Sequence, residues 1–148
     1  MIIETNYLVL LVVAIANMIL GMLWYGPLMF GKFWMRYNGV ADKDGNMLIS
    51  KEEFKKKQKE AGPLYFVQFL LSLVTAYVLF MYVKYIPGDN YGLGTAFSLW
   101  LGFIMPMAAA GVIWSNIESN QMRLKVFLVT SVYQLISIIL SAYIIWVW

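Results

Sequence analysis

Oxygen-bearing residues alternate along positions 42–53, in a pattern that could bind a calcium ion. Ca²⁺ takes six to eight oxygen ligands, and alternate side chains converge when a loop wraps the ion. The candidate ligands are five side chains and one backbone carbonyl, in chain order Asp42, Asp44, Asn46, Leu48 (carbonyl), Ser50 and Glu53. The segment therefore predicts a Ca²⁺ site, the one cofactor that the sequence suggests.

This spacing resembles the twelve-residue calcium loop of EF-hands, with Asp42 first, Glu53 last and Ile49 at the apolar eighth position. The departure is Met47, where the motif has glycine for a sharp turn, and a side chain there costs on the order of 1 kcal/mol. The same residues also fit a surface turn followed by a helix capping box, in which Ser50 and Glu53 bond each other's backbone. The two interpretations can share these residues, and both stay open.

A cluster of lysines follows the candidate calcium loop: Lys51, Lys55, Lys56, Lys57 and Lys59. These side chains could bind anionic lipid headgroups. The electrostatic attraction contributes about 1 kcal/mol per basic residue near a membrane surface. Alternatively, the charges serve only to fix the membrane topology. The two roles do not exclude each other, so membrane lipids are expected partners.

The elements that must position these residues are strongly apolar. The chain is 61% apolar and only 13% charged, whereas a soluble domain carries roughly 25% charged residues. Four segments reach the about 20 residues that a membrane-crossing helix needs: Tyr7–Leu28, Leu64–Ile86, Thr95–Trp114 and Val126–Trp148. We therefore expect an all-α integral membrane protein, a single domain over residues 1–148 with four transmembrane helices in a bundle.

The basic residues predict which side of the membrane each loop faces. Eight of the eleven Lys and Arg residues lie in the loop of residues 29–63, and Arg123 and Lys125 join the third and fourth spans. Lys84 alone lies on the opposite side. Cytoplasmic loops carry the excess of Lys and Arg, so both loops are expected in the cytoplasm and both termini outside, in the plasma or inner membrane.

Two short helices are expected within the loop of residues 29–63. Phe30, Phe33, Trp34 and Tyr37 share one helical face opposite Lys32 and Arg36, a pattern typical of a helix lying in the headgroup layer. Residues 50–60 predict a charged cytoplasmic helix. The pair Gly62-Pro63 is expected to separate that helix from the second span.

Several kinds of chemistry are excluded by composition. The chain contains neither Cys nor His, which removes thiolate nucleophiles, imidazole bases and the common zinc and haem ligand sets. The four predicted spans contain no carboxylate for a proton relay or for coupled ion transport. We therefore expect no enzyme activity. The net charge of +3 reflects topology and predicts no nucleic-acid partner.

A few uncharged polar residues fall inside the predicted spans. Asn17 lies in the middle of the first span, and the fourth carries Ser131, Gln134, Ser137 and Ser141 on one side. Hydrogen bonds between helices explain such residues, because an unpaired amide in hydrocarbon is costly. A polar permeation path through Asn17 and Gln134 is the alternative.

Small residues recur at every fourth position of the third span: Gly94, Ser98, Gly102, Pro106 and Ala110. Such a stripe lets two helix backbones approach closely. It predicts close packing either within the four-helix bundle or across a homodimer. Pro106 also frees the carbonyl of Gly102 and is expected to kink the helix.

The first span ends in a recognisable motif. Residues 20–27 read Leu-Gly-Met-Leu-Trp-Tyr-Gly-Pro, and residues 28–34 continue as Leu-Met-Phe-Gly-Lys-Phe-Trp. This motif, with Trp100-Leu101-Gly102-Phe103 in the third span, resembles a prokaryotic family of small four-span membrane proteins known as domain of unknown function 1761. The resemblance covers essentially the whole chain and implies a membrane fold without a mechanism.

The favoured function is that of a self-associating structural or interaction protein, most simply a homodimer, with a basic lipid-facing cytoplasmic loop. The first alternative is an oligomeric passive channel or small-solute transporter. The second is a calcium-responsive membrane protein that uses the EF-hand-like loop.

Overall fold

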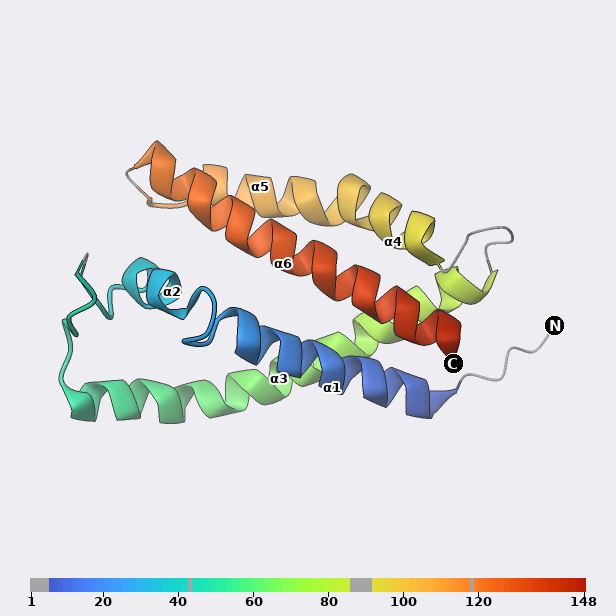
Figure 1. The fold of residues 1–148 in the computed structure, drawn as a ribbon, viewed down its shortest axis with the longest axis horizontal. Coiled ribbons are helices and arrows are strands. Elements are labelled where there is room, and N and C mark those ends of the chain that lie inside the picture. The colour runs from blue at the N-terminus through green and yellow to red at the C-terminus, as the bar shows by residue number, and fades with distance from the viewer. Residues whose placement is uncertain (1–5, 43, 86–91, 118) are drawn as a thin grey trace.

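The computed structural model describes residues 6–42, 44–85, 92–117 and 119–148. Lys43 of the candidate calcium loop and Ile86, the predicted end of the second span, lie outside these residues. The described chain is helical apart from turns and one isolated bridge between Ala41 and Met47. Within it, four helices are long and apolar enough to cross a membrane, as predicted (Figure 1).

The first span, α1 (Tyr7–Trp24), ends earlier than predicted. Its start is capped by Asn6, whose side chain accepts a hydrogen bond from the Leu8 backbone at 3.1 Å. After Trp24 the chain turns tightly, because Gly31 N donates to Gly26 O at 2.9 Å. That turn leads directly into α2 (Gly31–Tyr37), and the predicted span end at Leu28 is therefore wrong.

The second span, α3 (Lys51–Tyr85), runs without interruption through Gly62 and Pro63. The predicted break at this pair is wrong. Pro63 removes one backbone hydrogen bond, to the carbonyl of Lys59. Residues 62–68 and Lys59 are all exposed, so solvent can take that carbonyl, and no tertiary contact bends the helix away. At 35 residues α3 is about 52 Å long, much longer than the roughly 30 Å hydrocarbon core.

The third span contains a wide turn in place of a simple kink. It comprises α4 (Leu93–Leu99), the π-helical segment η2 (Trp100–Ile104) and α5 (Met105–Ile113). Met105 N donates to Trp100 O, five residues back. Pro106 cannot donate to Gly102, and a π-bulge is one way a helix accommodates such a missing bond.

The fourth span, α6 (Asn120–Val147), contacts every other membrane-spanning helix. Two indole groups donate to its backbone: Trp24 Nε1 to Val129 O at 3.1 Å, and Trp100 Nε1 to Ser131 O at 3.0 Å. At its start, Arg123 donates to the carbonyls of Ile113 and Ile117, which the end of α5 and the following loop leave unpaired. Thus α6 packs against all of the other described spans.

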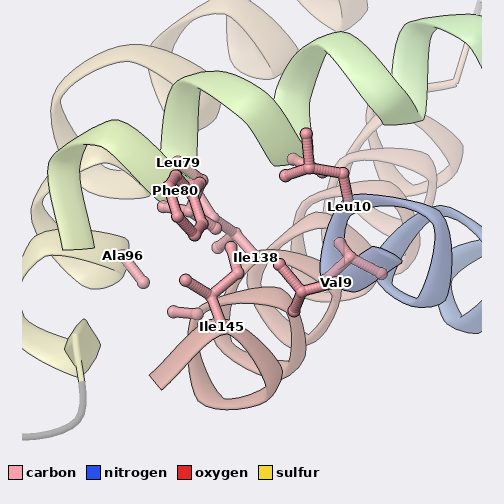
Figure 2. Close-up of a cluster of buried hydrophobic side chains, with 10 residues drawn as sticks. Val9, Leu10, Leu79, Phe80, Ala96, Ile138 and Ile145 are labelled. Carbon is pink, nitrogen blue, oxygen red and sulfur yellow. The ribbon is translucent and has the colours of Figure 1, made fainter. Parts of the chain in front are cut away.

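The apolar core lies toward the end of the molecule where α1 begins and α6 ends (Figure 1). Side chains from α1, α3, α4 and α6 point toward one another there (Figure 2). Val13, Ala76, Ala96, Ala142 and Ile145 have no exposed surface. The opposite end, called the α2 end below, carries α2, the start of α3 and the turn between α5 and α6 (Figure 1). The helices are therefore tightly packed at one end only.

Candidate functional site

A cavity of about 790 Å³ lies between α1, α3 and α6, on the α2 side of the apolar core. Its walls are formed mainly by polar and aromatic side chains. They come from α1 and the turn after it (Asn17, Met18, Gly21, Met22, Tyr25, Gly26), α2 (Trp34), α3 (Tyr65, Gln68, Ser72, Thr75), η2 (Ile104) and α6 (Thr130, Tyr133, Gln134, Ser137, Ile138, Ser141). A volume of this size is typical of sites for small organic ligands.

Three residues form a hydrogen-bonded floor. Asn17 Nδ2 donates to Ser141 Oγ at 2.9 Å, and Ser137 Oγ donates to Asn17 Oδ1 at 2.8 Å. Ser141 Oγ also donates to its own helix, at Ser137 O. The Asn17 amide is thus oriented by two bonds from one helix to the other.

The floor is closed on the side of the apolar core by a layer of apolar side chains. One helical turn beyond Asn17, Thr75 and Ser141, their helices carry Val13, Leu79 and Ile145. These three residues are at most 2% exposed. The cavity lining stops at this layer, so the structure presents a closed-ended cavity here, without a continuous pore.

Aromatic rings surround the other end of the cavity. Tyr25 lies 4.7 Å from Trp34 and 5.1 Å from Tyr133 between ring centroids, in tilted arrangements. The tight turn between Gly26 and Gly31 brings Trp34 back against Tyr25. A Cβ on Gly31 would overlap the Gly26 carbonyl, so this turn requires glycine.

The α3 wall is the part of the site that sequence analysis missed. Tyr65, Gln68, Ser72 and Thr75 line the cavity at spacings of three, four and three residues. This spacing places them on one helical face. This spacing is visible in the sequence. However, apolar residues separate the four, and uncharged side chains indicate a site less clearly than a charged motif does.

Among the residues that the structure describes, no Asp, Glu, Lys or Arg side chain lines the cavity. Of the two polar residues singled out from the sequence, Asn17 is buried and fully engaged, and Gln134 also lines the cavity. Gln134 Oε1 is buried without a hydrogen-bond partner. Ser131, on the same helix, does not line the cavity, and its hydroxyl is likewise unpaired among the described residues.

The candidate calcium loop forms two separate local structures. Asp42 accepts hydrogen bonds from the backbone of Asp44 and Asn46 and from the Asn46 side chain, at 2.8–2.9 Å. These bonds from Asn46 hold the pKa of the Asp42 carboxyl below its usual value. Ser50 and Glu53 form the capping box at the start of α3, with bonds of 2.9 and 3.1 Å. Leu48 donates its N–H to Val40 O.

The structure thus brings the predicted ligands together in two groups, the turn and the cap, and does not join these into one site. Among the described residues, no three carboxylates gather where they could hold a metal ion. Calcium binding stays a prediction. Calorimetric titration of the whole protein tests it, and an absence of heat at millimolar Ca²⁺ would reject it.

Lys51, Lys55, Lys56, Lys57 and Lys59 are all exposed on the first turns of α3. The small-residue stripe, Gly94, Ser98, Gly102, Pro106 and Ala110, is also exposed along its whole length. A Cβ added at Gly102 would meet nothing within 4 Å. The stripe is therefore not buried by the helices described here, and its packing within a bundle is not what the structure shows.

The chain was compared with known proteins. A family model described as "Protein of unknown function (DUF1761)" matches residues 8–146, nearly the whole chain. This match confirms the resemblance inferred from the motif at the end of the first span. No curated protein and no solved structure matches the chain.

Proposed function

Because the chain belongs to the DUF1761 family, whose description records no activity, we propose a function from the cavity: the protein binds a small uncharged molecule from the cytoplasm, as a carrier does in its inward-facing state. The observation behind the proposal is a large cavity between the spans, lined by hydroxyls, amides and aromatic rings and closed by an apolar layer at one end. A purely structural protein would have no need of such a cavity, since unfilled polar space costs packing energy.

The distribution of basic residues supports the inward orientation. Lys32, Arg36 and the five lysines of α3 lie toward the α2 end, together with Arg123 and Lys125. The excess of Lys and Arg on cytoplasmic loops puts that end in the cytoplasm and the chain termini outside. The cavity then lies on the cytoplasmic side of the apolar layer.

The lining supports an uncharged ligand. Amides, hydroxyls and aromatic rings bind by hydrogen bonds and ring contacts, and no side chain supplies an opposite charge. An ion would therefore enter a site of low dielectric without compensation, which is unfavourable. A neutral molecule loses only its hydrogen bonds to water, and the walls can replace these.

Accessibility of single cysteines tests this function directly. The chain has no native Cys, so no residue must first be removed. Thr75→Cys introduces a thiol into the cavity wall. Val74→Cys, at the preceding residue of α3, is the matched control, because Val74 is 60% exposed on the isolated protein but does not line the cavity. An uncharged, water-soluble methanethiosulfonate applied to inside-out vesicles should modify the first thiol much faster than the second, because only a hydrated thiol ionises to the reactive thiolate.

A second candidate function, self-association, is favoured by the exposed third span. Only 6% of its apolar window is buried, against 22–33% for the other three spans. Close approach of small residues drives helix association in lipid, and the stripe from Gly94 to Ala110 fits a second copy of this chain. Native mass spectrometry tests it: Gly102→Leu should convert a dimer to a monomer, and an unchanged mass would reject the seam.

The first turns of α3 are proposed to contact anionic lipid. Since α3 is longer than the hydrocarbon core, its charged start extends beyond it. Lys51 and its four neighbours would then lie at the headgroups of the inner leaflet, where each contributes about 1 kcal/mol. Replacing the five lysines with Gln should weaken retention of anionic lipid in mild detergent, and retention equal to that of the unchanged protein would argue against it.

A further inference from the structure

Gln134 stands out within the cavity because its carboxamide is unused. It lies on α6 between Thr130 and Ser137, which also line the cavity. Its Oε1 atom is buried and has no hydrogen-bond partner among the described residues. Asn17, the other amide of the inner wall, is instead held by Ser137 and Ser141. The third amide of the lining, Gln68, is exposed. Among the described residues, Gln134 is therefore the cavity amide whose oxygen is buried without a partner.

A buried amide oxygen without a hydrogen-bond partner is costly, because it has lost its bonds to water and gained none in the protein. Leu or Met would fill the same space on α6 without that cost. The carboxamide can turn about its terminal bond, whose torsion is broad and roughly two-fold. Such a rotation would let the carboxamide turn Oε1 and Nε2 toward a molecule bound in the cavity.

The chemistry of a free carboxamide restricts its partner. It offers one acceptor and one donor side by side, and a second carboxamide or a lactam satisfies both at once in a cyclic pair. The rings of Tyr25, Trp34 and Tyr133 at the same cavity provide apolar faces for a flat ring. A carboxylate could accept from Nε2, but its charge would find no basic side chain in the lining.

We propose that Gln134 is the specificity-determining residue of the cavity and that it recognises an uncharged aromatic molecule carrying a carboxamide or lactam group. This assignment rests on the proposed function, since it requires that the cavity admit a ligand.

Three matched probes test the assignment: 4-fluorobenzamide, its N,N-dimethyl derivative and 4-fluorobenzoate. The second has no N–H donor and the third is charged. Each is titrated by ¹⁹F NMR against the full-length protein in nanodiscs of uncharged lipid, with empty nanodiscs subtracted. The primary amide should bind about tenfold more tightly than the other two, because neither of them has an N–H that can donate to the buried Oε1.

Substitution locates the recognition. Gln134→Leu should reduce binding of 4-fluorobenzamide about tenfold and abolish its advantage over the dimethyl probe. Gln121→Leu is the control, since Gln121 is exposed on the first turn of α6 and does not line the cavity. Gln134→Met provides a second apolar variant of similar length should the leucine variant fail to fold.

The failures are distinguishable. Equal binding of the three probes, or unchanged binding by both Gln134 variants, would overturn the role of Gln134 and leave the cavity as a binding site. If no probe binds although Thr75→Cys reacts with the aqueous reagent, the ligand class is wrong. If Thr75→Cys does not react, the proposed function itself fails.

Discussion

Asn17 on α1 donates to Ser141 on α6 across 2.9 Å, and this bond lies where the apolar core ends and the polar cavity begins. On the core side, Val13 and Ile145, one turn from each partner, are fully buried. On the other side the helices leave room for a ligand. The pair thus joins two helices at the boundary between the apolar core and the cavity.

Loss of the Asn17 amide should destabilise the protein modestly. Asn17→Leu removes both bonds to α6, and interhelical hydrogen bonds in membranes are worth roughly 0.6–2 kcal/mol. We expect the free energy of unfolding to fall by about 1 kcal/mol, measured by SDS titration in mixed micelles. Thr130→Val is the control, because the Thr130 hydroxyl bonds only to carbonyls of its own helix. Equal losses in the two variants would show that the α1–α6 bond contributes nothing.

Gln134→Leu should change the free energy of unfolding in the opposite direction. It replaces an amide without a partner by an apolar side chain of similar size, so the free energy of unfolding should rise, by about 1 kcal/mol. The same SDS titration measures it. A loss of stability would mean that Gln134 makes structural bonds that the described residues do not show.

Gly31→Ala should disrupt the placement of α2. The new Cβ would overlap the carbonyl of Gly26, so the turn must open and Trp34 must move away from Tyr25. We expect a loss of about 1–3 kcal/mol and a shift in tryptophan fluorescence. Gly62→Ala serves as the control, because nothing lies within 4 Å of its Cβ. At that exposed position of α3, alanine should stabilise by about 0.5–1 kcal/mol, and the reverse order would contradict the structure.

Acid should open the turn at Asp42. Its pKa is lowered in the folded protein by the bonds from Asn46. The ionised carboxylate therefore stabilises the turn fully above pH about 4, which is the pKa of Asp in the unfolded chain. That contribution is lost as the pH falls through the lower, folded pKa. NMR titration of the Asn46 amide between pH 6 and 2 should show this transition. Asn46→Ala should raise the pKa of Asp42, whereas Asn38→Ala, outside the turn, should leave it unchanged.

Much of the fold follows from local sequence. The four spans are set by long apolar runs, and the capping box at Ser50 and Glu53 by adjacent residues. Pro63 was misleading. A proline ends a helix where the freed carbonyl finds no other hydrogen-bond partner, or where other contacts draw the chain away from the helix axis. On exposed α3 neither condition holds, and the helix continues.

The cavity could not be predicted in the same way, because it depends on how three helices separate. Asn17 and Gln134 were recognisable as polar residues in apolar spans. Their different surroundings come from geometry alone: Ser137 and Ser141 lie opposite Asn17, whereas no described residue pairs with Gln134 Oε1. Likewise, Gln68 and Thr75 become cavity residues only because α3 presents that face to α1 and α6.

The central claim is that water and small solutes reach Thr75 from the cytoplasm while the neighbouring Val74 faces lipid. In inside-out vesicles, Thr75→Cys should react with an uncharged, water-soluble methanethiosulfonate at least roughly tenfold faster than Val74→Cys, because only a hydrated thiol ionises to the reactive thiolate. Equal rates at the two positions, or reaction of neither, would contradict the account.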